Sequence, residues 1–210
     1  MARSQDLSLQ AAGIETRVAF AQGLWKLQDG SNGRKYWGCS ILIPKTVDIA
    51  ALKELALEAA IEEHGDKAKQ MLSDGLIKSP FLDGDGKQGK NKKTGEAHEG
   101  FPGHTFLRVT SGEDYRPKLL GPDLLPLTEQ SQLKSGDYGF PVVNAFTWYN
   151  KENGHGITFG MSMFMKSRAG ESLGGSGGPG PAEDYFTPIK NEGSAPDETK
   201  SGDGAASFFG

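Results

Sequence analysis

The sequence has little that would support disulfide or membrane chemistry. Cys39 is its only cysteine, so no disulfide can form within the chain. No apolar run approaches the roughly 20 residues that a membrane-spanning helix needs. Residues 1–6 lead into no apolar segment of the kind found in signal peptides. We therefore expect a soluble protein of a reducing compartment, with Cys39 buried in a hydrophobic strand.

Motifs for catalysis or metal binding are also missing. Residues 84–90 nearly match a phosphate-binding loop, but Asn91 follows where serine or threonine is needed. Residues 83–86 hint at a calcium loop, but Lys87 takes the fifth ligand position. No two histidines have the short spacing of a ligand pair. We expect no enzyme activity, no cofactor and no metal.

The negative charge lies at the C-terminal end. The net charge is −4, yet residues 182–210 alone hold six acidic and two basic residues. The rest of the chain holds 21 of each sign, so its cations are free to gather on one face. The C-terminal end is rich in glycine, proline and serine and ends in Phe208 and Phe209, an apolar hook for a protein partner.

Alternation of apolar and polar residues predicts about five to six strands, five of them with defined bounds. These are residues 14–20, 36–43, 104–110, 138–149 and 157–166. One main helix is predicted from about residue 49 to a stop at Gly65, with Thr46 or Asp48 as its cap, and a second helical segment over residues 66–72. Residues 79–100 read as an exposed loop. The pattern favours a mainly β fold, a β-barrel of the OB type with one main helix and long loops, because closure protects sheet edges.

The predicted organisation is a single domain with two appendages. Residues 1–13 are expected to form a flexible N-terminus, residues 14–170 the OB-fold domain, and residues 171–210 a disordered acidic tail.

Aromatic and cationic side chains share strand faces, as in proteins that stack bases on rings and neutralise phosphates with lysine and arginine. The candidate DNA contacts are Lys45, Lys90, Lys92, Lys93, His104, Phe106, Arg108, Tyr115, Arg116, Lys118, Tyr138, Phe146 and Trp148. The alternative for each single aromatic is a place in the core. The alternative for the lysines of residues 87–93 is a solvated loop.

Eight short segments occur in the order seen in a known family. They are residues 41–45, 103–108, 116–117, 135–138, 144–146, 156–160, 170–175 and 182–186. With them the chain resembles a bacteriophage family of single-stranded DNA-binding proteins with an OB-fold. Residues 187–210 and the lysine loop depart from the family pattern.

The resemblance implies sequence-tolerant binding of single-stranded DNA in phage DNA replication, recombination or repair, in the cytoplasm of the infected bacterial host. Replication or recombination proteins would be partners of the tail, and a homo-oligomer is an open alternative. Two other functions are left open by the sequence. One is a metal-dependent phage nuclease that uses His98, Glu99 and His104, and the other is a structural or interaction protein of the virion.

Overall fold

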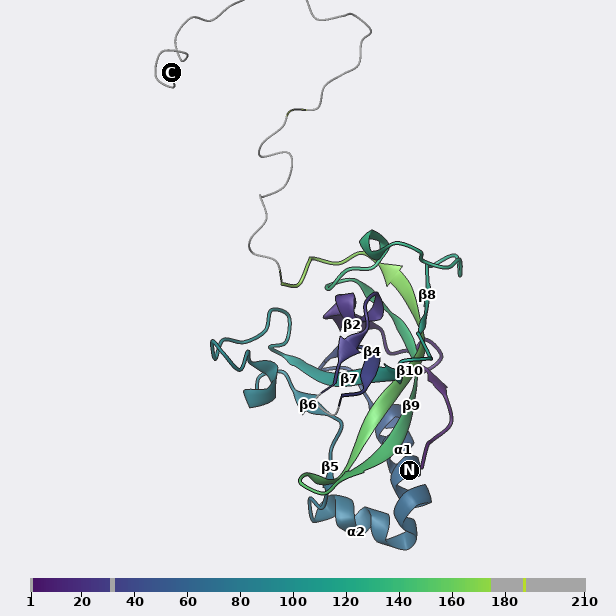
Figure 1. The fold of residues 1–210 in the computed structure, drawn as a ribbon, viewed down its shortest axis with the longest axis vertical. Helices are drawn as coiled ribbons and strands as arrows, with labels where there is room; N and C mark the ends of the chain where they lie inside the picture. The colour runs from purple at the N-terminus through teal and green to yellow at the C-terminus, as the bar shows by residue number, and fades with distance from the viewer. Residues whose placement is uncertain (1, 31–32, 175–186, 188–210) are drawn as a thin grey trace, which may run out of the picture. The chain divides into compact units, whose positions relative to one another are not determined.

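Five strands of the computed structural model close into a barrel (Figure 1). They are β2 (Thr16–Ala19), β4 (Lys35–Pro44), β7 (His104–Gly112), β9 (Tyr138–Asn150) and β10 (Gly154–Arg168). The pairing runs β2–β4–β7–β10–β9 and returns to β2; β7 and β10 are parallel, and the other neighbours are antiparallel. This closed order is that of an OB-fold, so the predicted mainly β barrel is confirmed. The structure describes residues 2–30, 33–174 and 187.

Shorter elements extend the barrel. Five short strands add to its edges: β1 (Leu7–Ser8), β3 (Gln28–Asp29), β5 (Ile77–Lys78), β6 (Leu82–Asp83) and β8 (Lys118–Leu120). The described residues also form four 3₁₀ turns: η1 (Ala21–Leu24), η2 (Gly65–Lys67), η3 (Lys87–Gly89) and η4 (Gln130–Gln132). The predicted loop over residues 79–100 therefore contains β6 and η3.

The main helix, α1 (Ala50–His64), packs against β9 and β10. Asp48 accepts a hydrogen bond of 2.9 Å from the N–H of Ala50 at its start, and Gly65 ends it with φ of 58°, a value glycine adopts without penalty. The buried stripe of α1 closes the barrel interior; it is made of Leu52, Leu55, Ala56, Ala59 and Ala60. The short α2 (Ala68–Ser73) follows. No helix among the described residues is long and apolar enough to cross a membrane.

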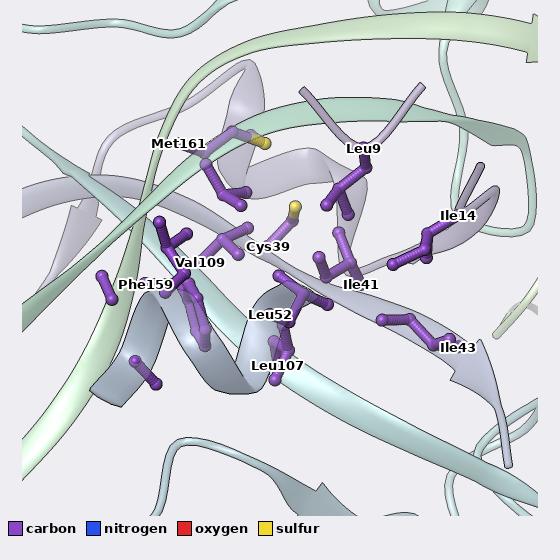
Figure 2. Packing of buried hydrophobic residues seen from close by; sticks show 14 of the residues in the cluster. Leu9, Ile14, Cys39, Ile41, Ile43, Leu52, Leu107, Val109, Phe159 and Met161 are labelled. Carbon is purple, nitrogen blue, oxygen red and sulfur yellow. The ribbon is translucent and has the colours of Figure 1, made fainter. Parts of the chain in front are cut away.

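The barrel interior is filled by alternate residues of its strands. Figure 2 shows part of this core, with Cys39 and Ile41 of β4, Leu107 and Val109 of β7, and Phe159 of β10 pointing toward one another. Burial raises the pKa of the Cys39 thiol to about 12, which keeps it protonated and unreactive. Cys39 is thus a small core residue.

Both ends of the predicted domain extend further than expected. Instead of forming a flexible N-terminus, residues 2–9 lie along β9, where the N–H of Ser4 donates to Ala145 (2.8 Å) and the N–H of Thr147 donates to Ala2 (3.0 Å). After β10, Leu173 is buried and its N–H donates to Ser135 (2.9 Å). Backbone pairing and apolar burial hold these segments, which composition alone does not reveal. Phe208 and Phe209 lie outside the described residues.

Candidate nucleic-acid interface

Small residues form a shallow floor on the outer face of the barrel. The register aligns Gly38, Thr110, Gly160 and Asn144 in one row across β4, β7, β10 and β9. A Cβ atom at Gly160 would lie 2.7 Å from Oδ1 of Asn144, and one at Gly38 would lie 2.7 Å from the carbonyl oxygen of Val109. There is no room for a side chain at Gly38 or Gly160, so the floor stays low there.

A more prominent row borders this floor. Ser40 pairs with Arg108 across β4 and β7, and Phe146 pairs with Thr158 across β9 and β10. Arg108 is exposed and Phe146 is half-buried. Strand alternation therefore gives the outer face a cation and an aromatic ring beside a low floor.

The first of three hollows on this face has a volume of about 650 Å³ and is called here the aromatic hollow. Tyr115, Arg116 and Lys118 reach it from β8 and the residues before it, and Phe146 and Arg3 line it from β9 and the N-terminal segment. Tyr115 is 76% exposed. This hollow combines two aromatic rings with cations.

The second, the basic hollow, has a volume of about 530 Å³ and is lined by Lys87, Gln88, Lys90, Asn91, Lys92, His98 and Arg108. Its lysines lie on a small hairpin, because the N–H of His98 donates to Gly89 and that of Asn91 donates to Glu96, each at 2.8 Å. None of its four cations forms an ion pair within the described part of the chain. The charge is therefore available to an anionic ligand.

A third hollow, of about 320 Å³, lies next to the other two and is called here the connecting hollow. It shares Thr110 with the aromatic hollow and Arg108 with the basic hollow, and Phe20 and Tyr36 also line it. Asp114 is the one acid among the residues that line the three hollows. We call the three hollows together the groove.

The groove gathers seven of the thirteen candidate DNA contacts predicted from the sequence. They are Lys90, Lys92, Arg108, Tyr115, Arg116, Lys118 and Phe146. Lys93 is exposed on the same hairpin but lines none of the three hollows. His104 is half-buried beside Pro102, with its Nδ1 atom 2.9 Å from the Pro102 carbonyl oxygen.

Phe106 is a correction to the predicted set. It is 1% exposed, and it packs edge-on against Phe101 at a centroid distance of 4.8 Å. Ala19, Leu42 and Leu173 complete this second core cluster. The alternation rightly places Phe106 opposite Leu107, but segments distant in sequence cover that part of the outer face, so Phe106 cannot stack a base.

Lys45 also differs from its predicted role. Its Nζ atom lies 2.6 Å from Oδ1 of Asp83 and 2.7 Å from Oδ2 of Asp85. The hydrogen bonds with Asp83 and Asp85 raise the pKa of Lys45 and lower the pKa of both carboxyls. Its charge is compensated within the protein, so it is a weak candidate for a phosphate contact.

Two predicted stacking residues lie away from the groove. The Tyr138 ring is packed by Arg168, whose guanidinium carbon is 3.5 Å from the ring centroid, with Arg17 at 5.5 Å. The Trp148 ring lies over Gly156, where a Cβ atom would come within 2.2 Å of it. Both rings are half-buried and line none of the three hollows.

The alternative nuclease gains no support from the described residues. They contain no group of three or more His, Cys, Asp or Glu side chains that could hold a metal ion. Glu99 accepts a hydrogen bond of 2.8 Å from the N–H of Gly174, and His98 packs edge-on against Phe20. Glu99 and His98 are therefore both engaged in contacts within the protein.

Comparison with known proteins identifies the family. The model of the family described as Enterobacter phage Enc34, ssDNA-binding protein, matches residues 12–198. The chain belongs to this family. No curated protein matches the chain. The resemblance inferred from the eight ordered segments is therefore confirmed.

Two solved structures of the Enterobacter phage Enc34 family share the fold. The single-stranded DNA-binding protein from bacteriophage Enc34 in complex with ssDNA is 18% identical and superposes with a TM-score of 0.56, over 77% of this chain and 87% of that one. A second structure of the single-stranded DNA-binding protein from bacteriophage Enc34 is 18% identical, with a TM-score of 0.53 over 82% of this chain and 88% of that one. At this level of identity the likeness is one of fold.

Sequence reasoning missed several groove residues that the Enc34-type barrel brings together. The predicted DNA contacts do not include Lys87, Phe20 or Tyr36, and His98 is predicted only as part of the nuclease alternative. Phe20 ends the first predicted strand on its apolar face, so its position in the alternation favoured the core. Only the turn that follows it exposes the ring.

Proposed function

We propose that this protein binds single-stranded DNA along the groove with little sequence preference. The observation that carries the proposal is that three neighbouring hollows on an OB barrel share lining residues and bring exposed aromatic rings near cations that form no ion pair among the described residues. Family membership and the relative in complex with ssDNA support the same ligand.

Phosphates would be held by five groove cations that lack acidic partners among the described residues, Lys87, Lys90, Lys92, Arg108 and Lys118. Arg116 also lacks an acidic partner there, but its guanidinium packs against the Trp25 and Trp37 rings. Such contacts release counterions from the strand and read no sequence. Tyr115 and Phe146 would stack bases in the aromatic hollow, and every base offers a face for stacking. The low floor of the groove leaves space for the DNA strand.

The proposed role is in phage DNA replication, recombination or repair, in the cytoplasm of the infected host and without catalysis. A binder of this kind covers exposed single strands and needs no cofactor. Residues 2–174 would form the binding domain. Residues 182–210, with Phe208 and Phe209 at the end, would recruit replication or recombination proteins, as the sequence suggests.

The test is a titration of labelled oligo-dT by fluorescence anisotropy at several salt concentrations, with duplex DNA as competitor. Five phosphate contacts at about 0.7 each predict that log K falls against log salt with a slope of about −3.5. Duplex DNA should compete poorly, because its bases are already stacked. Absence of binding to oligo-dT at low salt, or equal affinity for the duplex, would contradict the proposal.

A further inference from the structure

Phe20 has a backbone conformation that bulky residues rarely adopt. Its φ is 58° and its ψ is 39°, in the left-handed region. The turn η1 fixes this geometry, because Gly23 donates to the Phe20 carbonyl at 3.1 Å and Ala21 donates to Oγ of Ser135 at 3.0 Å. A strained position that the surrounding structure imposes is a pointer to function.

The strained turn presents the Phe20 ring at the surface. The ring is 40% exposed. His98 packs edge-on against it at a centroid distance of 5.2 Å, and Phe101 packs at 5.8 Å with a tilt of 54°. Two rings thus support Phe20 while a large part of it stays open to a ligand. A flat apolar surface held in this way loses little conformational entropy when a base stacks on it.

The location of Phe20 connects it to the free cations. Phe20 and Arg108 both line the connecting hollow, and His98 and Arg108 both line the basic hollow. The ring therefore stands between the low floor of the groove and the lysine hairpin. A strand whose phosphates contact Arg108, Lys90 and Lys92 would carry its bases past this ring.

We infer that Phe20 is a base-stacking residue of the groove, with His98 and Phe101 as the residues that position its ring. The inference rests on the proposed function and adds a specific binding position to it. The Phe20 position binds one unstacked base of a single strand. Bases of a duplex are stacked on their neighbours, so the Phe20 position also favours single strands over duplexes.

The backbone of Phe20 makes a clean test feasible. Glycine adopts positive φ without penalty, so Phe20→Gly removes the ring and relieves the backbone at once. Asparagine also tolerates this region, so Phe20→Asn is a second variant that removes the ring. Phe20→Tyr keeps the stacking surface. Tyr149→Ala removes a ring that is 66% exposed and lines none of the three hollows, and it is the matched control.

The full-length variants are titrated with oligo-dT and with an abasic deoxyribose-phosphate strand of equal length, at several salt concentrations. Loss of one stacked base should weaken binding of oligo-dT by about 5- to 150-fold for Phe20→Gly and Phe20→Asn. The salt slope should not change, because no phosphate contact is lost. Affinity for the abasic strand should also be unchanged, and Phe20→Tyr and Tyr149→Ala should bind as the unmodified protein does.

Two results would overturn the inference while the proposed function stands. In one, folded Phe20→Gly and Phe20→Asn bind oligo-dT as tightly as the unmodified protein. In the other, they lose the same factor on the abasic strand, which would make Phe20 a structural residue. Failure of the unmodified protein to bind oligo-dT is a different result, and it contradicts the proposed function itself.

Discussion

The guanidinium carbon of Arg116 lies 5.1 Å from the centre of the Trp37 ring, so a cation that lines the groove also takes part in the packing of the barrel wall. The Trp25 ring lies 5.2 Å away, and the Nε–H of Arg116 donates to the Leu24 carbonyl at 3.3 Å. Arg116 therefore links the residues before β8 to the segment around η1.

Substitution of Arg116 should cost stability. The loss of two cation–π contacts and one hydrogen bond predicts that Arg116→Ala lowers the free energy of unfolding by about 2 kcal/mol. Arg116→Lys should keep less than half of the free energy of unfolding that Arg116→Ala loses, because an ammonium group lacks the planar stacking surface of a guanidinium. Urea unfolding at pH 7 measures both. Lys118→Ala, which removes an exposed cation with no such contacts, should leave stability unchanged; equal losses for Arg116→Ala and Lys118→Ala would refute the argument.

Removal of the unpaired groove cations should reduce the salt dependence of binding. Each of Arg108→Ala, Lys90→Ala and Lys92→Ala should make the slope of log K against log salt shallower by about 0.7, because one phosphate contact is lost. The measurement is the oligo-dT titration at four or more salt concentrations, with unfolding curves to show that the variants are folded.

Two lysines serve as controls for that series. Lys69→Ala on α2 removes an exposed cation that lines none of the hollows of the groove, and should leave the slope unchanged. Lys45→Ala should change it less than Lys90→Ala, because Asp83 and Asp85 already neutralise Lys45. A slope that falls equally for Lys69→Ala and Lys90→Ala would show that only the net charge matters.

The strands and the main helix could be predicted because their signals are local. Alternation marks β7 over a few consecutive residues, and Gly65 ends α1 where a positive φ is required. The order of the barrel follows less directly, since pairing such as that of β7 with β10 joins residues about 50 positions apart. The mainly β pattern and the need to close sheet edges still favoured the correct class.

Which residues are available in the groove depends on long-range contacts, and no local sequence pattern contains these. Phe106 occupies the outer face as its alternation predicts, yet Phe101 and Leu173 cover it. Lys45 lies just past the end of β4 as expected, and its acidic partners are Asp83 at the end of β6 and Asp85 two residues later. Arg108 lies on the face opposite Leu107 and Val109, as the alternation predicts, and it stays exposed beside the small Ser40. Contacts with segments distant in sequence therefore determine which predicted residues are available to bind DNA.

Asp137 should make stability depend on pH in the acid range. Lys166 lies 2.8 Å from its Oδ2 atom, and the N–H groups of Lys134 and Gly170 donate to the carboxylate at 2.9 and 3.2 Å. Burial acts to raise the pKa of Asp137, but these hydrogen bonds outweigh it and hold the pKa below the ordinary value of 3.8. The carboxylate therefore stabilises the fold fully above about pH 5 and loses this effect as the pH falls through its folded pKa.

The variant Asp137→Asn tests this expectation. At pH 7 it should lower the free energy of unfolding by about 3 kcal/mol, because Lys166 is left without its buried partner. The difference from the unmodified protein should shrink when unfolding by urea is repeated at pH 3 and below. A difference that stays constant with pH would show that packing of the side chain, rather than its charge, is what matters.

The acidic C-terminal segment should weaken binding of DNA through its charge. Residues 182–210 carry the whole net charge of −4, and the cations of the basic hollow have no acidic partner among the described residues. A tethered negative segment competes with phosphates for such cations. A chain that ends after Gly180 should therefore bind oligo-dT several-fold more tightly at low salt, and the gain should fade as salt screens the charges.

A full-length variant with the six acids of residues 182–210 replaced by asparagine and glutamine should match the shortened chain, because length is kept and charge is lost. If that variant binds like the unmodified protein while the shortened chain binds more tightly, the segment acts by occupying space rather than through its charge. If neither differs from the unmodified protein, the segment does not act on the groove, and its role would rest on partner binding through Phe208 and Phe209.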